Sequence, residues 1–309
     1  MKTAWFGTGL GMAVWSMVAA AAAAAAAIRA DEPVSVLTTD VPEAADAGDV
    51  YLLRYRLSAD ESIRYEVTQV AKTKTRIRGA EDTAQVHTVS EKLWRVTAVA
   101  GDGQMTFDHS VDSVEMMQQT GDNEEIRWSS RSGDVPPIIF ETVADQLQKP
   151  LVTVTVNPRG QETARQQHAG TDMQLGMGGL TLALPEESIA VGNSWSVPRE
   201  IKARDEAGQI KVIKVRETYR LEKVQAGVAT LQVRTEILTP IEQASVKAQI
   251  VQQLSNGNIR FDIDAGRVLS KELDWDETVV GFQGDNSLME YRARITERLI
   301  EGPARTARR

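Results

Sequence analysis

The sequence predicts a mainly β protein that is built from two duplicated, curved antiparallel sheets or half-barrels, each with one short helix. Three observations lead to this fold class. Apolar and polar residues alternate along most of the chain after residue 50, prolines precede two short segments of helical spacing, and the same order of features occurs twice. The 309 residues suffice to bury a core without disulfides, and the chain contains no cysteine.

Residues 1–30 are predicted to be a signal peptide. Lys2 gives a short basic region, and residues 4–28 form an apolar run that ends in a block of alanines. We expect cleavage after Ala30 or, as an alternative, after Ala27. A retained membrane anchor is the other interpretation, because about 20 apolar residues can span a bilayer.

Residues 31–49 are acidic and contain no aromatic residue, which predicts a disordered linker. We therefore expect the protein to be exported, to the periplasm or outside the cell. The membrane would be contacted only through the signal segment, if that segment stays uncleaved.

The strands are predicted from period-two alternation. Met105, Phe107 and Val111 share one face of a strand, and residues 229–237 alternate in the same way. Similar runs occupy residues 63–70, 92–99, 151–157, 209–224, 259–264 and 288–300. Strands that are long relative to their turns predict a strongly curved sheet and argue against a βαβ fold.

Two segments break the alternation and predict short helices. Each follows proline, Pro136-Pro137 in one case and Pro240 in the other, and proline suits the first turn of a helix. The apolar residues at helical spacing are Ile138, Ile139, Val143 and Leu147 in the first segment, and Ile241, Ala244, Ala248, Val251 and Leu254 in the second. Each helix would have one apolar stripe to pack on a sheet.

The order strand, glycine turn, strand, helix, strand and glycine turn occurs twice, which predicts an internal duplication. The first β-rich repeat is placed at residues 50–175, the second at 176–302, and a basic tail at 303–309. The repeated order of features closes with the turns 157–160 and 264–266. Chance similarity between two β-meanders is the alternative.

Three stretches, residues 150–160, 184–195 and 261–267, resemble a family of exported bacterial proteins that is known mainly as a domain of unknown function. The resemblance covers residues 50–300 and implies no chemistry. It implies a shape similar to the curved half-barrels of the LolA/LolB lipoprotein carriers, with helices in the concavity. This is an analogy of fold, and it transfers no function by itself.

No residue set predicts catalysis, and we expect neither an enzyme nor a cofactor. The net charge of −8 argues against a nucleic-acid partner. His87, His109 and His168 lack metal-ligand spacing, and no Gly-x-Ser-x-Gly motif is present. Asp262 and Asp264 suit a solvated turn better than a calcium loop.

The central segment offers candidate contacts for an apolar ligand, because flexible apolar side chains next to glycines form adaptable surfaces. These residues are Met173, Leu175, Met177 and Leu180. The alternative is a crossover between the repeats that packs in the core.

A basic row offers candidate contacts for an anion or a protein partner. Its residues are Lys72, Lys74, Arg76 and Arg78. The alternative is a charged strand that protects an exposed sheet edge from aggregation.

The leading hypothesis is an exported, non-enzymatic binding protein of the cell envelope. It would hold an apolar ligand, or an apolar segment of an envelope partner that the sequence does not identify, in a concave sheet. The alternative is a structural or interaction protein of the envelope with a filled core and no ligand.

Overall fold

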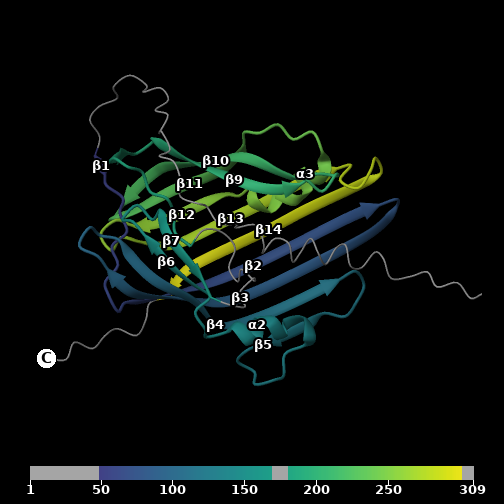
Figure 1. The fold of residues 1–309 in the computed structure, drawn as a ribbon, viewed down its shortest axis with the longest axis horizontal. Coiled ribbons are helices and arrows are strands. Elements are labelled where there is room, and N and C mark those ends of the chain that lie inside the picture. Colours follow the sequence, from purple (N-terminus) through teal and green to yellow (C-terminus); the bar gives the residue numbers. More distant parts are fainter. Residues whose placement is uncertain (1–48, 169–179, 301–309) are drawn as a thin grey trace, which may run out of the picture.

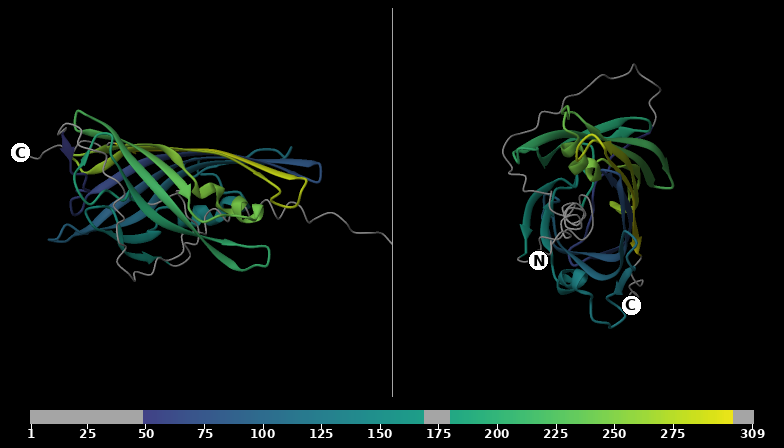
Figure 2. Two further views of the ribbon diagram at one scale, coloured as in Figure 1. Left: turned by 90° about the horizontal axis from the view of Figure 1, so that it is seen from above. Right: turned by 90° about the vertical axis from the view of Figure 1, so that its right-hand side faces the viewer.

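The computed structural model describes residues 49–168 and 180–300, and in this part the chain is mainly β (Figure 1). The mainly β class with a short helix in each half is confirmed. The two expected sheets are joined edge to edge into one antiparallel sheet of twelve strands, which is curved and not closed into a barrel (Figure 2). Its strand order is β7-β6-β4-β3-β2-β14-β13-β12-β11-β10-β9, with β5 paired to β4.

The strands of the first half lie on one side of the sheet and those of the second half on the other. The first half contributes β2 (Ser62–Ile77), β3 (Ala80–Val99), β4 (Met105–Thr120), β5 (Ile126–Ser129), β6 (Val152–Val156) and β7 (Glu162–Gln167). The second half contributes β9 (Ser194–Arg204), β10 (Ile210–Gln225), β11 (Val228–Ile237), β12 (Asn256–Asp262), β13 (Arg267–Val280) and β14 (Ser287–Ile300). The short strands β1 (Val50–Tyr51) and β8 (Ile189–Ala190) pair with each other.

The two halves share their order of elements and their pairings. In the first half β3 pairs with β4, a helix follows, and β4 then pairs with β6; in the second half β10, β11 and β12 are arranged in the same way. The halves meet where β2 pairs with β14, from Ile77 opposite Ser287 to Arg64 opposite Ile300. A common origin of the halves stays a prediction.

The helices lie where they were predicted and are short. A 3₁₀ turn, η1 (Ile138–Phe140), leads into α2 (Glu141–Gln146), and α3 (Ala244–Ile250) leads into η2 (Val251–Gln253). The second helix begins four residues after Pro240 rather than next to it. The preceding residues are tied to β10, because the backbone N–H groups of Leu238 and Thr239 both point to the carbonyl oxygen of Lys214, at 2.8 and 3.3 Å.

Both helices pack on the sheet face that carries the buried aromatic residues, which we call the inner face. α2 packs with Val111 and Val114 of β4, and α3 packs with Ile213 and Val215 of β10. These two small clusters flank the main core, which draws residues from both halves of the sheet. The opposite face is the outer face.

Residues 53–57 close one end of the inner face. Their backbone crosses between the end turns of the two halves, where the N–H of Tyr55 donates to the carbonyl of Pro158 (2.8 Å) and the N–H of Arg56 donates to the carbonyl of Gly266 (3.0 Å). The Tyr55 hydroxyl accepts the N–H of Leu182 at 2.8 Å. The two turns of similar sequence thus hold the same segment.

Candidate functional site

The inner face is filled by aromatic side chains at the end that residues 53–57 close. Tyr65, Trp94, Phe107 and Phe261 are buried there, and the rings of Trp94 and Phe107 stack with centroids 4.6 Å apart. Tyr55 packs edge-on against Phe261 at 5.5 Å. Large rings thus occupy successive inner positions at this end.

Farther along the same strands the inner face carries smaller, half-buried side chains, which we call the inner strip. Its residues are Ala71 and Thr73 of β2, Val86 and Thr88 of β3, Met116 of β4 and Ala293 of β14. Ala71 lies opposite both Val86 and Ala293, and Thr88 lies opposite Met116. The alanine pair lies at the seam of the two halves. Two buried rings border the strip on the side of the second half, Tyr291 opposite Thr73 and Trp275 opposite Ala293.

A buried charge cluster, consisting of Lys92, Lys271 and Glu297, lies between the filled end and the inner strip. The Glu297 carboxylate is 2.7 Å from the Lys92 amine and 3.7 Å from the Lys271 amine. The side chains of Lys92 and Glu297 are each 6 % exposed. The Lys92 amine also lies over the rings of Tyr65 and Trp94, at 5.2 and 5.3 Å from their centroids.

The Glu297 carboxylate is held in its ionised form. Burial opposes the charge on Glu297, but Lys271 and Lys92 outweigh this effect and lower the pKa of Glu297 to about 2. Burial lowers the pKa of Lys92, and the Glu297 carboxylate counteracts part of that shift. A buried ion pair of this kind depends on both partners, since removing one leaves an unbalanced charge in the core.

His109 adjoins the cluster as the cross-strand neighbour of Trp94. It is only 4 % exposed, and burial together with the nearby Lys92 lowers its pKa to about 3. Neither the His109 Nε2 atom nor the Trp94 Nε1 atom has a hydrogen-bond partner in the part of the chain that the structure describes. His109 is therefore a neutral core residue at ordinary pH, with unused hydrogen-bonding capacity.

We expect His109 to make the stability of the protein depend on pH. The unfolded chain takes up a proton near pH 6.5 and the folded chain only near pH 3. The unfolding free energy should therefore fall by about 1.4 kcal/mol per pH unit as the pH drops below 6.5, until the pH nears 3. His109→Val introduces the residue that stands at the corresponding position of the second half, Val233. This variant should lose the pH dependence of the unfolding free energy, measured by urea denaturation between pH 6 and 4.5. His87→Val on the outer face is the control and should keep the wild-type profile, and a slope that survives in His109→Val would contradict the prediction.

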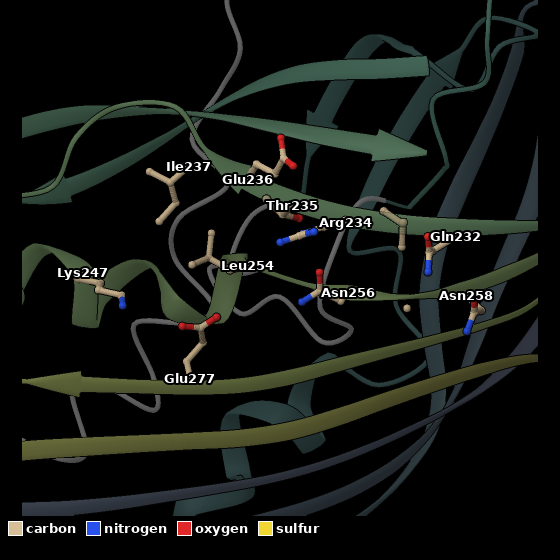
Figure 3. Close-up of a pocket in the computed structure, with 12 residues that line it drawn as sticks. Gln232, Arg234, Thr235, Glu236, Ile237, Lys247, Leu254, Asn256, Asn258 and Glu277 are labelled. Atoms are coloured by element: carbon tan, nitrogen blue, oxygen red, sulfur yellow. The ribbon is translucent and has the colours of Figure 1, made fainter. Parts of the chain in front are cut away.

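Two surface pockets lie at equivalent places in the two halves, each beside the helix that follows β4 or β11. The second-half pocket has a volume of ≈ 660 Å³ and opens where β11 and β12 stop pairing, beyond Arg234 and Asn256 (Figure 3). Lys247 of α3 and Glu277 of β13 also line it. The first-half pocket, of ≈ 490 Å³, lies beside α2. Charged and amide groups line the larger pocket, which therefore does not suit an apolar ligand.

The predicted apolar contacts fall mostly outside the described residues. Met173, Leu175 and Met177 lie there, and Leu180 is half-buried against the main core. The following residues Leu182 and Leu184 are buried. Contact of a ligand with Met173, Leu175, Met177 and Leu180 stays a prediction.

The basic row lies on the central strand β2 and the turn after it, so its interpretation as protection for a sheet edge is wrong. Whether a strand lies at the edge of a sheet depends on long-range pairing, and β2 is central because it pairs with β14 as well as with β3. Lys72, Arg76 and Arg78 are exposed, and Lys74 pairs with Glu81 at 3.0 Å. Binding of an anion or partner by this row stays a prediction.

The acidic turn and the remaining histidine have structural contacts. The Asp262 carboxylate accepts the backbone N–H groups of Asp264 and Ala265, at 3.0 and 2.7 Å, which fixes the turn. The Thr153 hydroxyl lies 2.6 Å from Asp108 Oδ1 and 2.9 Å from His168 Nε2. In residues 49–168 and 180–300, no group of three or more acidic or histidine side chains is placed to hold a metal ion.

The comparisons with known proteins identify no family. No protein-family model matches the chain, and no curated protein matches it. A solved structure described as "Lipid-protein interactions in lipovitellin" is 10 % identical, with 82 % of this chain and 27 % of that chain covered and a TM-score of 0.44. DynF from the dynemicin biosynthesis pathway of Micromonospora chersina is 8 % identical, with 88 % and 94 % covered and a TM-score of 0.23. The chain thus spans about a quarter of the lipovitellin chain, and neither likeness is close enough to support a function.

Proposed function

We propose that the protein is a non-enzymatic binding protein that holds an apolar ligand, or an apolar segment of a partner, on the inner strip. The observation that carries the proposal is the change along the inner face of β2 and β3 from the large buried rings of Tyr65 and Trp94 to smaller, half-buried side chains such as Ala71 and Val86. Mainly apolar side chains with a few polar groups are typical of ligand sites. The strip spans the register of β2 from Gln69, opposite Thr88, to Thr73, which is about 13 Å at roughly 3.3 Å per residue.

Export and the likeness to the LolA/LolB carriers are part of this proposal. Export rests on the composition of residues 1–30. The carrier likeness rests on the open curved sheet with two short helices on its inner face, flanking the seam of the two halves. In the described part of the chain, no helix is both long and apolar enough to cross a bilayer.

An interaction protein of the envelope is the second candidate. Val135 and Ile138 are 86 % and 84 % exposed on either side of Pro136-Pro137. Adjacent exposed apolar residues are typical of protein contacts. Under this alternative the protein carries no ligand, and cross-linking in cells would repeatedly capture one partner through this loop.

A matched pair of substitutions tests the ligand site. Ala71→Phe places a ring on the floor of the inner strip and is expected to weaken binding of a fluorescent acyl probe at least tenfold. The control Val70→Phe changes the adjacent residue on the outer face, where Val70 is 49 % exposed, and should leave probe affinity unchanged. Solvent extraction and mass spectrometry of the natively purified protein would identify a ligand. Absence of probe binding and of any extracted ligand would contradict the proposal and favour the interaction protein.

A further inference from the structure

The buried charge cluster lies at the inner end of the strip. Glu297 lies opposite Val67 of β2 and Lys271 of β13. Ala293 of the inner strip precedes Glu297 by four residues on β14. That separation corresponds to about 13 Å along an antiparallel strand. A ligand that extends along the strip toward the filled end therefore meets the charge cluster.

The cluster has an excess of positive charge. Glu297 is shared by Lys92 and Lys271, and among the ion pairs of the described residues Lys271 contacts no other carboxylate. The Lys271 side chain is 15 % exposed, so most of its surface is covered by the protein. His109 is neutral and does not balance this charge. A buried cation without a full counter-charge is costly, and an anion placed beside it would offset that cost.

Unused hydrogen-bonding atoms lie beside the same cluster. Trp94 is 1 % exposed and His109 is 4 % exposed, and within the described ranges the Trp94 Nε1 and His109 Nε2 atoms have no partner. The indole N–H can only donate, and neutral imidazole donates from Nε2 when that nitrogen carries the proton. Together with the ammonium groups, the cluster offers several donors for few acceptors. A carboxylate is the complementary group, because it only accepts.

We infer that the ligand of the inner strip is an amphiphile with an anionic head, which binds beside Lys271 and Lys92 while its apolar chain lies over Ala71 and Ala293. The inference rests on the proposed function and adds the chemical class of the ligand. Lys271 is the more exposed of the two lysines and would make the direct contact. Glu297 would keep the Lys92 amine in place, and Trp94 and His109 would donate to the head group.

The experiment compares ligands of one chain length on the full chain. Palmitate, hexadecyl phosphate and the neutral hexadecanol would be tested by displacement of a neutral fluorescent acyl probe. Palmitate is expected to bind at least tenfold more tightly than hexadecanol. If hexadecyl phosphate binds as tightly as palmitate, the site recognises the negative charge; if it binds more weakly, the site is specific for the carboxylate, and both results support the anionic head.

Variants of Lys271 connect this preference to the cluster. Lys271→Met should abolish the preference for palmitate over hexadecanol, whereas Lys271→Arg should keep it. Lys214→Met, which removes an exposed lysine from the outer face of β10, is the matched control and should bind as the wild type does. Equal affinity of the wild type for palmitate and hexadecanol would overturn the inference while leaving the proposed function intact. Failure of every ligand and of the probe to bind would overturn the proposed function as well.

Discussion

Glu297→Gln is expected to lower the unfolding free energy by about 3–5 kcal/mol, measured by urea denaturation at pH 7. The substitution keeps the shape of the side chain but removes the carboxylate that lies 2.7 Å from the Lys92 amine. Lys92 is then a buried cation with aromatic rings and a second lysine as its neighbours. Such a group must lose its proton or draw water into the core, and either change costs free energy.

A control and a double variant separate charge from packing. Glu290→Gln changes a half-buried glutamate of the outer face on the same strand and should alter stability by less than about 0.5 kcal/mol. Lys92→Met combined with Glu297→Leu should be less destabilised than the sum of the two single variants, because Lys92 and Glu297 are then removed together and only Lys271 loses its carboxylate. A loss below about 1 kcal/mol in Glu297→Gln would show that the ion pair is not required for the fold.

Gly266→Ala is expected to lower the unfolding free energy by about 2–4 kcal/mol, through both backbone strain and overpacking. Gly266 has a φ of +61°, and a Cβ atom there would lie 2.5 Å from the backbone nitrogen of Arg56 and 2.8 Å from the carbonyl oxygen of Arg54. Gly160→Ala should have a similar effect, since its φ is +74° and its Cβ would overlap the carbonyl of Leu182 and the ring of Tyr55.

Gly208→Ala isolates the backbone component of this effect. Its φ is +79°, yet a Cβ there meets nothing within 4 Å. We expect a loss of about 1 kcal/mol, the ordinary cost of placing alanine at a positive φ. Thermal and urea unfolding of the three variants would show whether residues 53–57 fix the end turns, and equal losses at all three glycines would contradict that role.

The strands and helices could be predicted because they depend on local periodicity. The faces of residues 105–111 and 229–237 agree with the alternation of their side chains. The single sheet could not be predicted, because the pairing of β2 with β14 joins residues more than 200 positions apart. Local patterns define which face of each strand is apolar, but they do not identify its distant neighbour.

Two residues of the charge cluster stand out in the sequence, but the alternation of apolar and polar residues does not explain them. Lys92 is in phase with Trp94 and Val96, and Glu297 is in phase with Ile295 and Leu299. Each charge therefore interrupts an apolar face. A buried charge is stable only beside an opposite charge, and Lys92 and Glu297 are 205 residues apart in the sequence. The sequence therefore does not show that the two residues form an ion pair.

The pairing of β2 with β14 also constrains how the chain can fold. β14 follows all the other strands of the sheet in the sequence, so this strand in the middle of the sheet is synthesised after them. During synthesis the earlier strands of each half can pair with one another, but the pairing of β2 with β14 must wait until β14 has been synthesised. Until then β2 and β13, the two strands that β14 joins, each expose an unpaired backbone edge. Late folding intermediates should therefore be prone to aggregate or to exchange halves between molecules, and loss of β14 should divide the sheet rather than shorten it.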